Sequence, residues 1–169
     1  MRWIRCSVGV GLIAAVSLSG AVATASVAAK TPQACTLFTS AIATTALGGP
    51  VNPAQQTKPN PNTTICKYSR ADGQAFGDVQ VSPWSFLSEF SLAGQTNKKV
   101  RGVGDKAYDL GSTFGVAVKK GSVGFIVDLS LAVGDFNGAA ATQLQAAETA
   151  ADIATAKQIV ASLSGKKKR

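Results

Sequence analysis

Two aspartates, Asp105 and Asp109, lie four positions apart and are the first candidates for chemistry. Paired carboxyl groups could serve as a general acid and base, or could hold a calcium ion through their oxygens. The spacing lacks the pattern of a calcium-binding loop, and an aspartate beside glycines more often makes hydrogen bonds within a turn. We therefore expect a structural role for Asp105, and a hydrolase-type site that uses Asp105 and Asp109 is the alternative.

The chain contains no histidine, which removes the usual base for a serine or cysteine nucleophile. The S-x-x-K match from Ser164 to Lys167 falls in the C-terminal tail, where no pocket could orient it. Residues 102–107 match the dinucleotide fingerprint G-x-G-x-x-A, but no βαβ unit surrounds them. We expect a tight glycine turn there, no cofactor, no metal and a non-catalytic protein.

Cysteine usage points to one disulfide. Cys6 lies in the N-terminal segment, which leaves Cys35 and Cys66 as an even pair in an exported chain. The loop between them spans about 30 residues, for which the chain-entropy model gives about 3–4 kcal/mol. A metal site or a catalytic thiol is the alternative, but both lack a histidine partner. Neither Cys6 nor Cys35 follows the Leu-x-small triplet of a lipidated cysteine.

The N-terminus is typical of a secretory signal peptide. Arg2 and Arg5 precede an apolar run at residues 8–22, which is too short to span a bilayer as a helix. Small residues suit cleavage after Ala25 or Ala29. We therefore expect a secreted, periplasmic or envelope-associated protein without a stable membrane anchor after cleavage; an uncleaved N-terminal anchor is the alternative.

The basic charge is concentrated at the two ends of the chain. The formal charge is +8, and without Arg2 and Arg5 it falls to +6, with 15 basic against 9 acidic side chains. Four of the remaining basic residues form the stretch 166–169. A nucleic-acid binder should show basic residues interleaved with aromatics across a folded face, and none is visible. We expect no nucleic-acid partner and a disordered tail over 165–169, with anionic envelope polymers or lipid headgroups as the tail's alternative partners.

Between signal and tail, residues 30–164 predict a single domain. Residues 35–47 favour a short helix, and the proline-rich stretch 48–62 favours a surface loop. Residues 63–70 and 76–82 predict paired strands, because Asp72 and Gly73 form a strong hairpin turn signal.

A second hairpin and a long helix complete the predicted fold. Residues 114–118 and 123–130 alternate apolar and polar side chains around a turn at 119–122. The alanine-rich stretch 139–163 predicts a helix. Its apolar stripe consists of Ala146, Ala150, Ile153, Ala156, Val160 and Leu163. The predicted class is α+β: a two-layer sandwich in which this helix and the short N-terminal helix cover an antiparallel sheet of about 4–5 strands.

The aromatic segment around Trp84, Phe86 and Phe90 is the most distinctive local feature. Phe86 and Phe90 are one helical turn apart, with Trp84 at the entry. Large aromatics can line a ligand groove, and we place Asp105 and Tyr108 in the same possible groove. The alternative is that these aromatics fill the core beside the sheet.

Short motifs in a fixed order resemble a known family. They are CTLFT at 35–39, LG at 47–48, CKY at 66–68 and VGDKAY at 103–108, followed by a valine-rich hairpin and an alanine-rich helix. Together they resemble small exported or lipoprotein domains of unknown function from actinobacteria and related bacteria, which are similar in outline to extracellular sensor domains of bacterial receptor kinases. The resemblance implies the fold, the disulfide and an envelope location. It supplies no catalytic residue, and this chain lacks the lipid-attachment cysteine of the lipoprotein members.

These observations predict a non-catalytic, exported envelope protein that acts as a ligand-binding or sensor-like module. We expect a monomer with an envelope ligand or protein partner whose identity the sequence leaves open. The alternatives are the hydrolase with Asp105 and Asp109, and a structural accessory protein of the envelope.

Overall fold

The computed structural model describes residues 31–91, 97–111, 114–134 and 137–165, with side chains described to residue 88 in the first range. The predicted signal peptide, residues 1–29, and residues 166–169 of the predicted tail lie outside this part of the chain. Among the described helices, none is long and apolar enough to cross a membrane.

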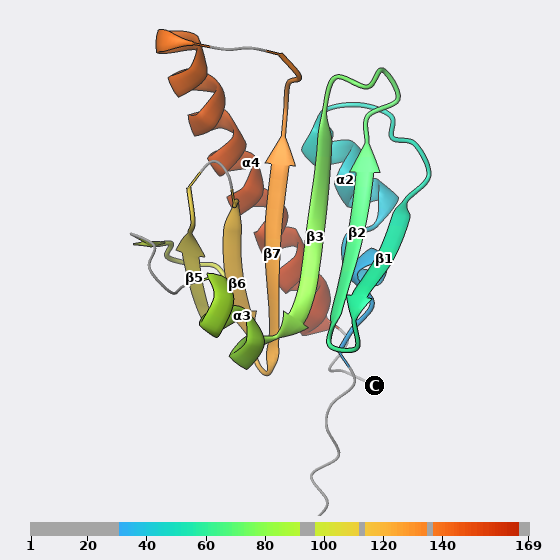
Figure 1. Cartoon of the computed structure of the whole chain (residues 1–169), viewed down its shortest axis with the longest axis vertical. Coiled ribbons are helices and arrows are strands. Elements are labelled where there is room, and N and C mark those ends of the chain that lie inside the picture. The colour runs from blue at the N-terminus through green and yellow to red at the C-terminus, as the bar shows by residue number, and fades with distance from the viewer. Residues whose placement is uncertain (1–30, 92–96, 112–113, 135–136, 166–169) are drawn as a thin grey trace, which may run out of the picture.

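The fold is α+β and is built on a seven-stranded antiparallel sheet (Figure 1). The sheet is larger than the predicted 4–5 strands. The strands lie in the order β1-β2-β3-β7-β6-β5-β4. Their bounds are β1 (Gln55–Asn60), β2 (Thr63–Ser69), β3 (Phe76–Pro83), β4 (Lys98–Lys99), β5 (Lys106–Asp109), β6 (Val116–Lys120) and β7 (Val123–Ser130). The helices are α1 (Ala34–Leu37), α2 (Ser40–Leu47), α3 (Trp84–Ser91) and α4 (Gly138–Gly165).

Both predicted hairpins are confirmed. β2 pairs with β3 and β6 with β7, each in antiparallel register. Gly73 and Gly121 sit in the turns with φ of 73° and 61°, a backbone conformation that glycine adopts without the strain of a side chain. These two hairpins meet through β3 and β7, so the centre of the sheet consists of the strands that the sequence predicted.

The alternating side chains of the central strands divide the sheet into two faces. Phe125, Val127 and Leu129 of β7 are buried in the main core cluster, which also includes residues of α1, α2 and α4. Figure 1 shows these three helices behind the sheet and α3 in front of it. We call the side that carries α3 the outer face.

Phe114 does not join the core as the alternation predicts, because it is 49% exposed. β6 begins only at Val116, and a turn precedes it in which the N–H of Gly115 bonds to the carbonyl of Gly111. Gly115 has φ of 67°, which interrupts the extended backbone and with it the side-chain alternation. Val116 and Val118 are buried as predicted.

The N-terminal helical region contains two helices rather than one. Phe38 ends α1 and is buried edge-on against Tyr68, with 5.3 Å between ring centroids. The hydroxyl of Thr39 then accepts the N–H of Ile42 and caps α2. α2 ends at Gly48, which has φ of 71°.

The Cys35–Cys66 disulfide joins α1 to β2. The S–S distance is 2.08 Å and the two Cα atoms are 4.9 Å apart. Cys66 is fully buried, so the bridge fastens the N-terminal helical region to the core face of the sheet. The structure therefore confirms the predicted pairing.

The stretch 48–62 is not only a loop, because it contains β1. β1 pairs with β2 through its backbone while its side chains are almost all exposed. The strand lies at the edge of the sheet, where Pro59 is tolerated because one side of the backbone needs no partner. Polar side chains on an edge strand leave no apolar alternation, so the sequence showed no strand pattern.

The long C-terminal helix is confirmed, but its buried stripe differs from the predicted one. Ala146 and Ala150 are exposed. The buried positions of α4 are Asp152, Thr155, Ala156 and Ile159. Two of these buried residues are polar. A stripe chosen from apolar residues alone therefore predicted the wrong buried face for the first half of the helix.

Candidate functional site

Trp84 and Tyr108 form a stacked aromatic pair on the outer face. Trp84 begins α3 directly after β3, and its N–H donates to the carbonyl of Ser122 at 3.1 Å. Tyr108 lies on β5 next to Ala107, whose side chain is buried in the core, so alternation places Tyr108 on the outer face. The ring centroids are 6.5 Å apart with an interplanar angle of 18°. Both side chains are only half-buried.

A glycine in β7 makes room for α3. A Cβ atom added at Gly124 would lie 2.7 Å from Cδ1 of Leu87 and 3.1 Å from the Cα of Trp84. Leu87 is 1% exposed, so α3 packs directly on the backbone of β7. This close approach holds the first residue of α3 against the sheet and extends the indole toward β5.

The other two aromatic candidates, Phe86 and Phe90, also belong to α3. Phe86 is half-buried on α3. The side chain of Phe90 lies outside the part of the chain whose side chains are described. Of the predicted groove residues, the structure therefore brings together Trp84 and Tyr108.

Asp105 fastens the β6–β7 turn instead of facing the aromatic pair. Its Oδ2 accepts the backbone N–H of Gly121 at 2.7 Å, and its Oδ1 lies 3.2 Å from Nζ of Lys120. These two contacts, the Gly121 N–H first, lower the pKa of the Asp105 carboxyl below its usual value. The carboxylate thus has the turn-stabilising arrangement that its glycine-rich surroundings predict.

Asp109 lies at the other end of β5 and caps a different turn. Its Oδ1 accepts the N–H of Gly111 at 2.9 Å. Four residues of extended chain separate Asp105 from Asp109, which is about 13 Å. Carboxyl pairs that act together on a glycosidic bond are at most about 9.5 Å apart.

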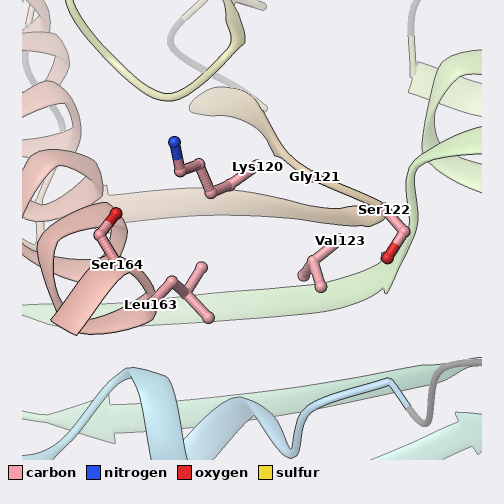
Figure 2. Close-up of a pocket in the computed structure, with 6 residues that line it drawn as sticks. All are labelled: Lys120, Gly121, Ser122, Val123, Leu163 and Ser164. Carbon is pink, nitrogen blue, oxygen red and sulfur yellow. The ribbon is translucent and has the colours of Figure 1, made fainter. Parts of the chain in front are cut away.

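A pocket of ≈ 370 Å³ lies next to the β6–β7 turn (Figure 2). Leu163 and Ser164, near the end of α4, lie across the pocket from the turn. The lining is completed by the turn residues Lys120, Gly121, Ser122 and Val123. The same turn therefore adjoins the pocket, the Asp105 contacts and the N–H of Trp84.

Sequence reasoning missed a pair of lysines beside the aromatic residues. Lys106 of β5 is the direct cross-strand partner of Lys119 of β6, and Lys119 in turn faces Gly124. Both lysines lie on the outer face, because Ala107 and Val118 point into the core. The alternation of Lys106, Ala107 and Tyr108 could have indicated this arrangement if the stretch had been assigned to a strand.

Acidic side chains gather at the opposite end of the sheet, on both of its faces. Asp78 and Asp128 are cross-strand partners on β3 and β7, whereas Glu148 and Asp152 are one turn apart on α4. Burial raises the pKa of the Asp78 carboxyl. The pKa of Asp128 is raised to about 6, first by burial and then by the negative charges of Asp78 and Glu148. No group of three or more acidic or cysteine side chains in the described residues is arranged to hold a metal ion.

Comparisons with known proteins give no further assignment. No protein-family model matches the sequence, and searches of curated proteins and of solved structures find no match.

Proposed function

We propose that this protein is a non-catalytic, exported module that binds a ligand of the cell envelope, in the manner of a sensor domain, through the Trp84–Tyr108 pair. The observation that carries the proposal is the position of these two rings. Large aromatic side chains usually fill a core. Trp84 and Tyr108 stack on the outer face, remain half-exposed and do not belong to the main core cluster.

The disulfide supports the envelope location. Structural disulfides persist in oxidising compartments such as the periplasm and the cell surface, and they are rare in the cytosol. The Cys35–Cys66 bridge and the predicted signal peptide therefore point to the same side of the membrane.

Tryptophan fluorescence provides a direct test. The sequence has two tryptophans, and without residues 1–29 only Trp84 remains. The chain from residue 30 onward should show a saturable change in emission with at least one member of a panel of cell-wall fragments, lipids and small metabolites. Tyr108→Ala should weaken that binding.

Phe76→Ala is the matched control. Phe76 is also an exposed aromatic residue of the outer face, but it lies at the opposite end of β3 from Trp84. The Phe76→Ala substitution should leave ligand binding unchanged. A flat response across the panel from a folded protein would rule out the proposal, as would equal losses in the two variants.

Two alternatives have less geometric support. A hydrolase that uses Asp105 and Asp109 would need carboxyl groups that work together, whereas each of these carboxylates caps its own turn. Hydrolase activity profiling in which Asp105→Asn abolishes turnover would favour the enzyme. A structural accessory role would be tested by a pull-down from envelope extracts with and without residues 166–169. Capture of an envelope protein only in the presence of these residues would favour that role.

A further inference from the structure

We propose that the ligand is an acidic polysaccharide, which binds along the outer face of β4, β5 and β6 where lysines flank the aromatic pair. We call this surface the basic–aromatic face. It comprises Trp84, Lys99, Lys106, Tyr108 and Lys119. The inference rests on the proposed function and names the class of ligand for the same site.

The strand register brings these side chains together. Lys99 pairs with Tyr108, Lys106 pairs with Lys119, and Lys119 pairs with Gly124, on which Trp84 packs. Direct cross-strand partners have Cβ atoms about 5 Å apart. The lysines therefore lie in two adjacent rows of the sheet, next to the stacked rings.

None of these lysines forms an ion pair with a carboxylate of the described residues, although the charge of Lys119 helps to lower the pKa of Asp105. Lys99 and Lys106 are exposed and Lys119 is half-buried. The ion pair at this end of the sheet is made by Lys120, which contacts Asp105. Like charges directly opposite each other destabilise a sheet, and Lys106 and Lys119 are such a pair. A bound anion would relieve their repulsion.

The C-terminal end of α4 reaches the same end of the sheet. Leu163 and Ser164 of α4 reach the β6–β7 turn, where they line the pocket in Figure 2. The basic residues 166–169 follow directly in the sequence. Charge complementarity with Lys99, Lys106 and Lys119 on the outer face favours an anion over a neutral ligand.

The aromatic pair favours a sugar as the carrier of the negative charge. An aromatic ring offers an apolar surface against which the C–H face of a pyranose can pack, while lysines pair with carboxylates on the sugar. A bilayer would need protruding apolar side chains here. The large exposed ones of the described chain lie at the other end of the sheet: Phe76, Phe114 and Val133.

Nucleic acid is the competing polyanion, and two observations count against it. The Cys35–Cys66 bridge is typical of proteins outside the cytosol. Trp84 and Tyr108 stack on each other, whereas a platform for bases presents separate rings to successive bases.

Calorimetry on the chain from residue 30 onward tests the inference with matched probes. An oligogalacturonate should bind, and a neutral oligogalactan of the same length should bind at least about tenfold more weakly. Affinity for the oligogalacturonate should fall as salt is added. Inorganic polyphosphate, single-stranded DNA and phosphatidylglycerol vesicles supply negative charge without this sugar chemistry and should bind more weakly.

The double variant Lys106→Gln/Lys119→Gln should lose about tenfold in affinity while keeping its fold, because it removes a repulsive pair. The control Lys58→Gln/Lys157→Gln removes the same charge at exposed positions on β1 and α4 and should bind as the parent does.

Equal binding of the acidic and neutral sugars would overturn the inference while leaving the proposed function intact. Binding of polyphosphate, DNA or vesicles as tight as that of the oligogalacturonate would overturn it too, as would equal losses in the two double variants. If none of the probes binds, the inference is wrong, and the fluorescence panel decides the proposed function separately.

Discussion

Asp78 on β3 and Asp128 on β7 lie directly opposite each other on the outer face of the sheet. Lys67 of β2 is the next partner in the same row, beside Asp78. Burial comes first among the causes that raise the pKa of both carboxyl groups, and Lys67 acts in the opposite direction on both. A single lysine therefore offsets part of the cost of placing two carboxylates side by side.

This row predicts opposite titration shifts in two variants. Asp78→Asn removes a neighbouring negative charge and should lower the pKa of Asp128 from its value of about 6. Lys67→Gln removes the attractive cation and should raise it. Carbon-detected NMR titration of the Asp128 carboxyl measures both. Shifts in the same direction would contradict the proposed coupling within the row.

Asp152 predicts how stability changes with pH. It is buried on α4, and its Oδ1 has no hydrogen-bond partner among the described residues. Burial, followed by the nearby charge of Asp128, raises its pKa from 3.8 to about 8. A raised pKa in the folded state means that the folded protein holds a proton that the unfolded chain releases. The free energy of unfolding should therefore decrease as the pH rises from about 4 to about 8.

Asp152→Asn should remove most of this decrease, because the amide resembles the protonated acid and never ionises. We expect a gain on the order of 5 kcal/mol at pH 8 and almost none at pH 4, measured by urea unfolding. Asp72→Asn is the control. The hydrogen bond from Arg70 lowers the pKa of the Asp72 carboxyl. Removing this carboxylate in Asp72→Asn should therefore reduce the free energy of unfolding at neutral pH. Equal effects of Asp152→Asn at the two pH values would refute this explanation.

The disulfide should make a large contribution to stability. The bridge closes a sequence separation of 31 residues. Cys35→Ala/Cys66→Ala should lower the free energy of unfolding by about 3–4 kcal/mol. Chemical denaturation of this variant should match that of the reduced parent protein. A variant as stable as the oxidised parent would show that packing of α1 alone fixes the N-terminal helical region.

Gly124→Ala should displace α3. Its new Cβ would lie 2.7 Å from Leu87 and 3.1 Å from the Cα of Trp84, so helix and strand must separate. We expect a loss of about 1–3 kcal/mol together with a changed Trp84 emission. Gly165→Ala, whose Cβ would meet nothing within 4 Å, serves as control. Unchanged fluorescence in Gly124→Ala would mean that α3 is not held by this contact.

The central strands were predictable because their outer face is polar and their inner face is apolar. Val127 and Leu129 alternate with Asp128 and Ser130, and this period of two is visible in the sequence. β1 and β4 were not predictable in this way, because their side chains are exposed and backbone pairing alone defines them. β5 was missed because it has only four residues next to a glycine-rich turn.

The buried side of α4 escaped prediction for a different reason. Glu148 and Asp152 are one turn apart on the helix, about 6 Å along its axis. Glu148 accepts the N–H of Leu131 at 3.0 Å, and the N–H of Leu129 moderates the raised pKa of Asp152. Two residues of extended chain span about 6.6 Å, so the helix and strand spacings match. The two acids of α4 can therefore each accept an N–H from β7 or the residue after it. This pairing is visible only once the helix is placed on the sheet, so the sequence alone could not predict it.

The candidate site was predictable only as a set of residue types. The sequence drew attention to Trp84 and Tyr108, but their contact depends on α3 crossing the outer face at Gly124. Lys119 and Lys106 carry no signal in isolation, since lysines are common on surfaces. Their meaning comes from strand register, which places them opposite each other beside the rings.

The two outermost strands also bear on how the protein behaves when many copies are crowded together. β4 has only two residues, and β1 carries Lys58 and Pro59 along its outward edge. A short strand offers few free amides, and a charged residue and a proline discourage an incoming strand from aligning. The described sheet therefore gives neighbouring copies few places at which to add strands and grow into fibrils.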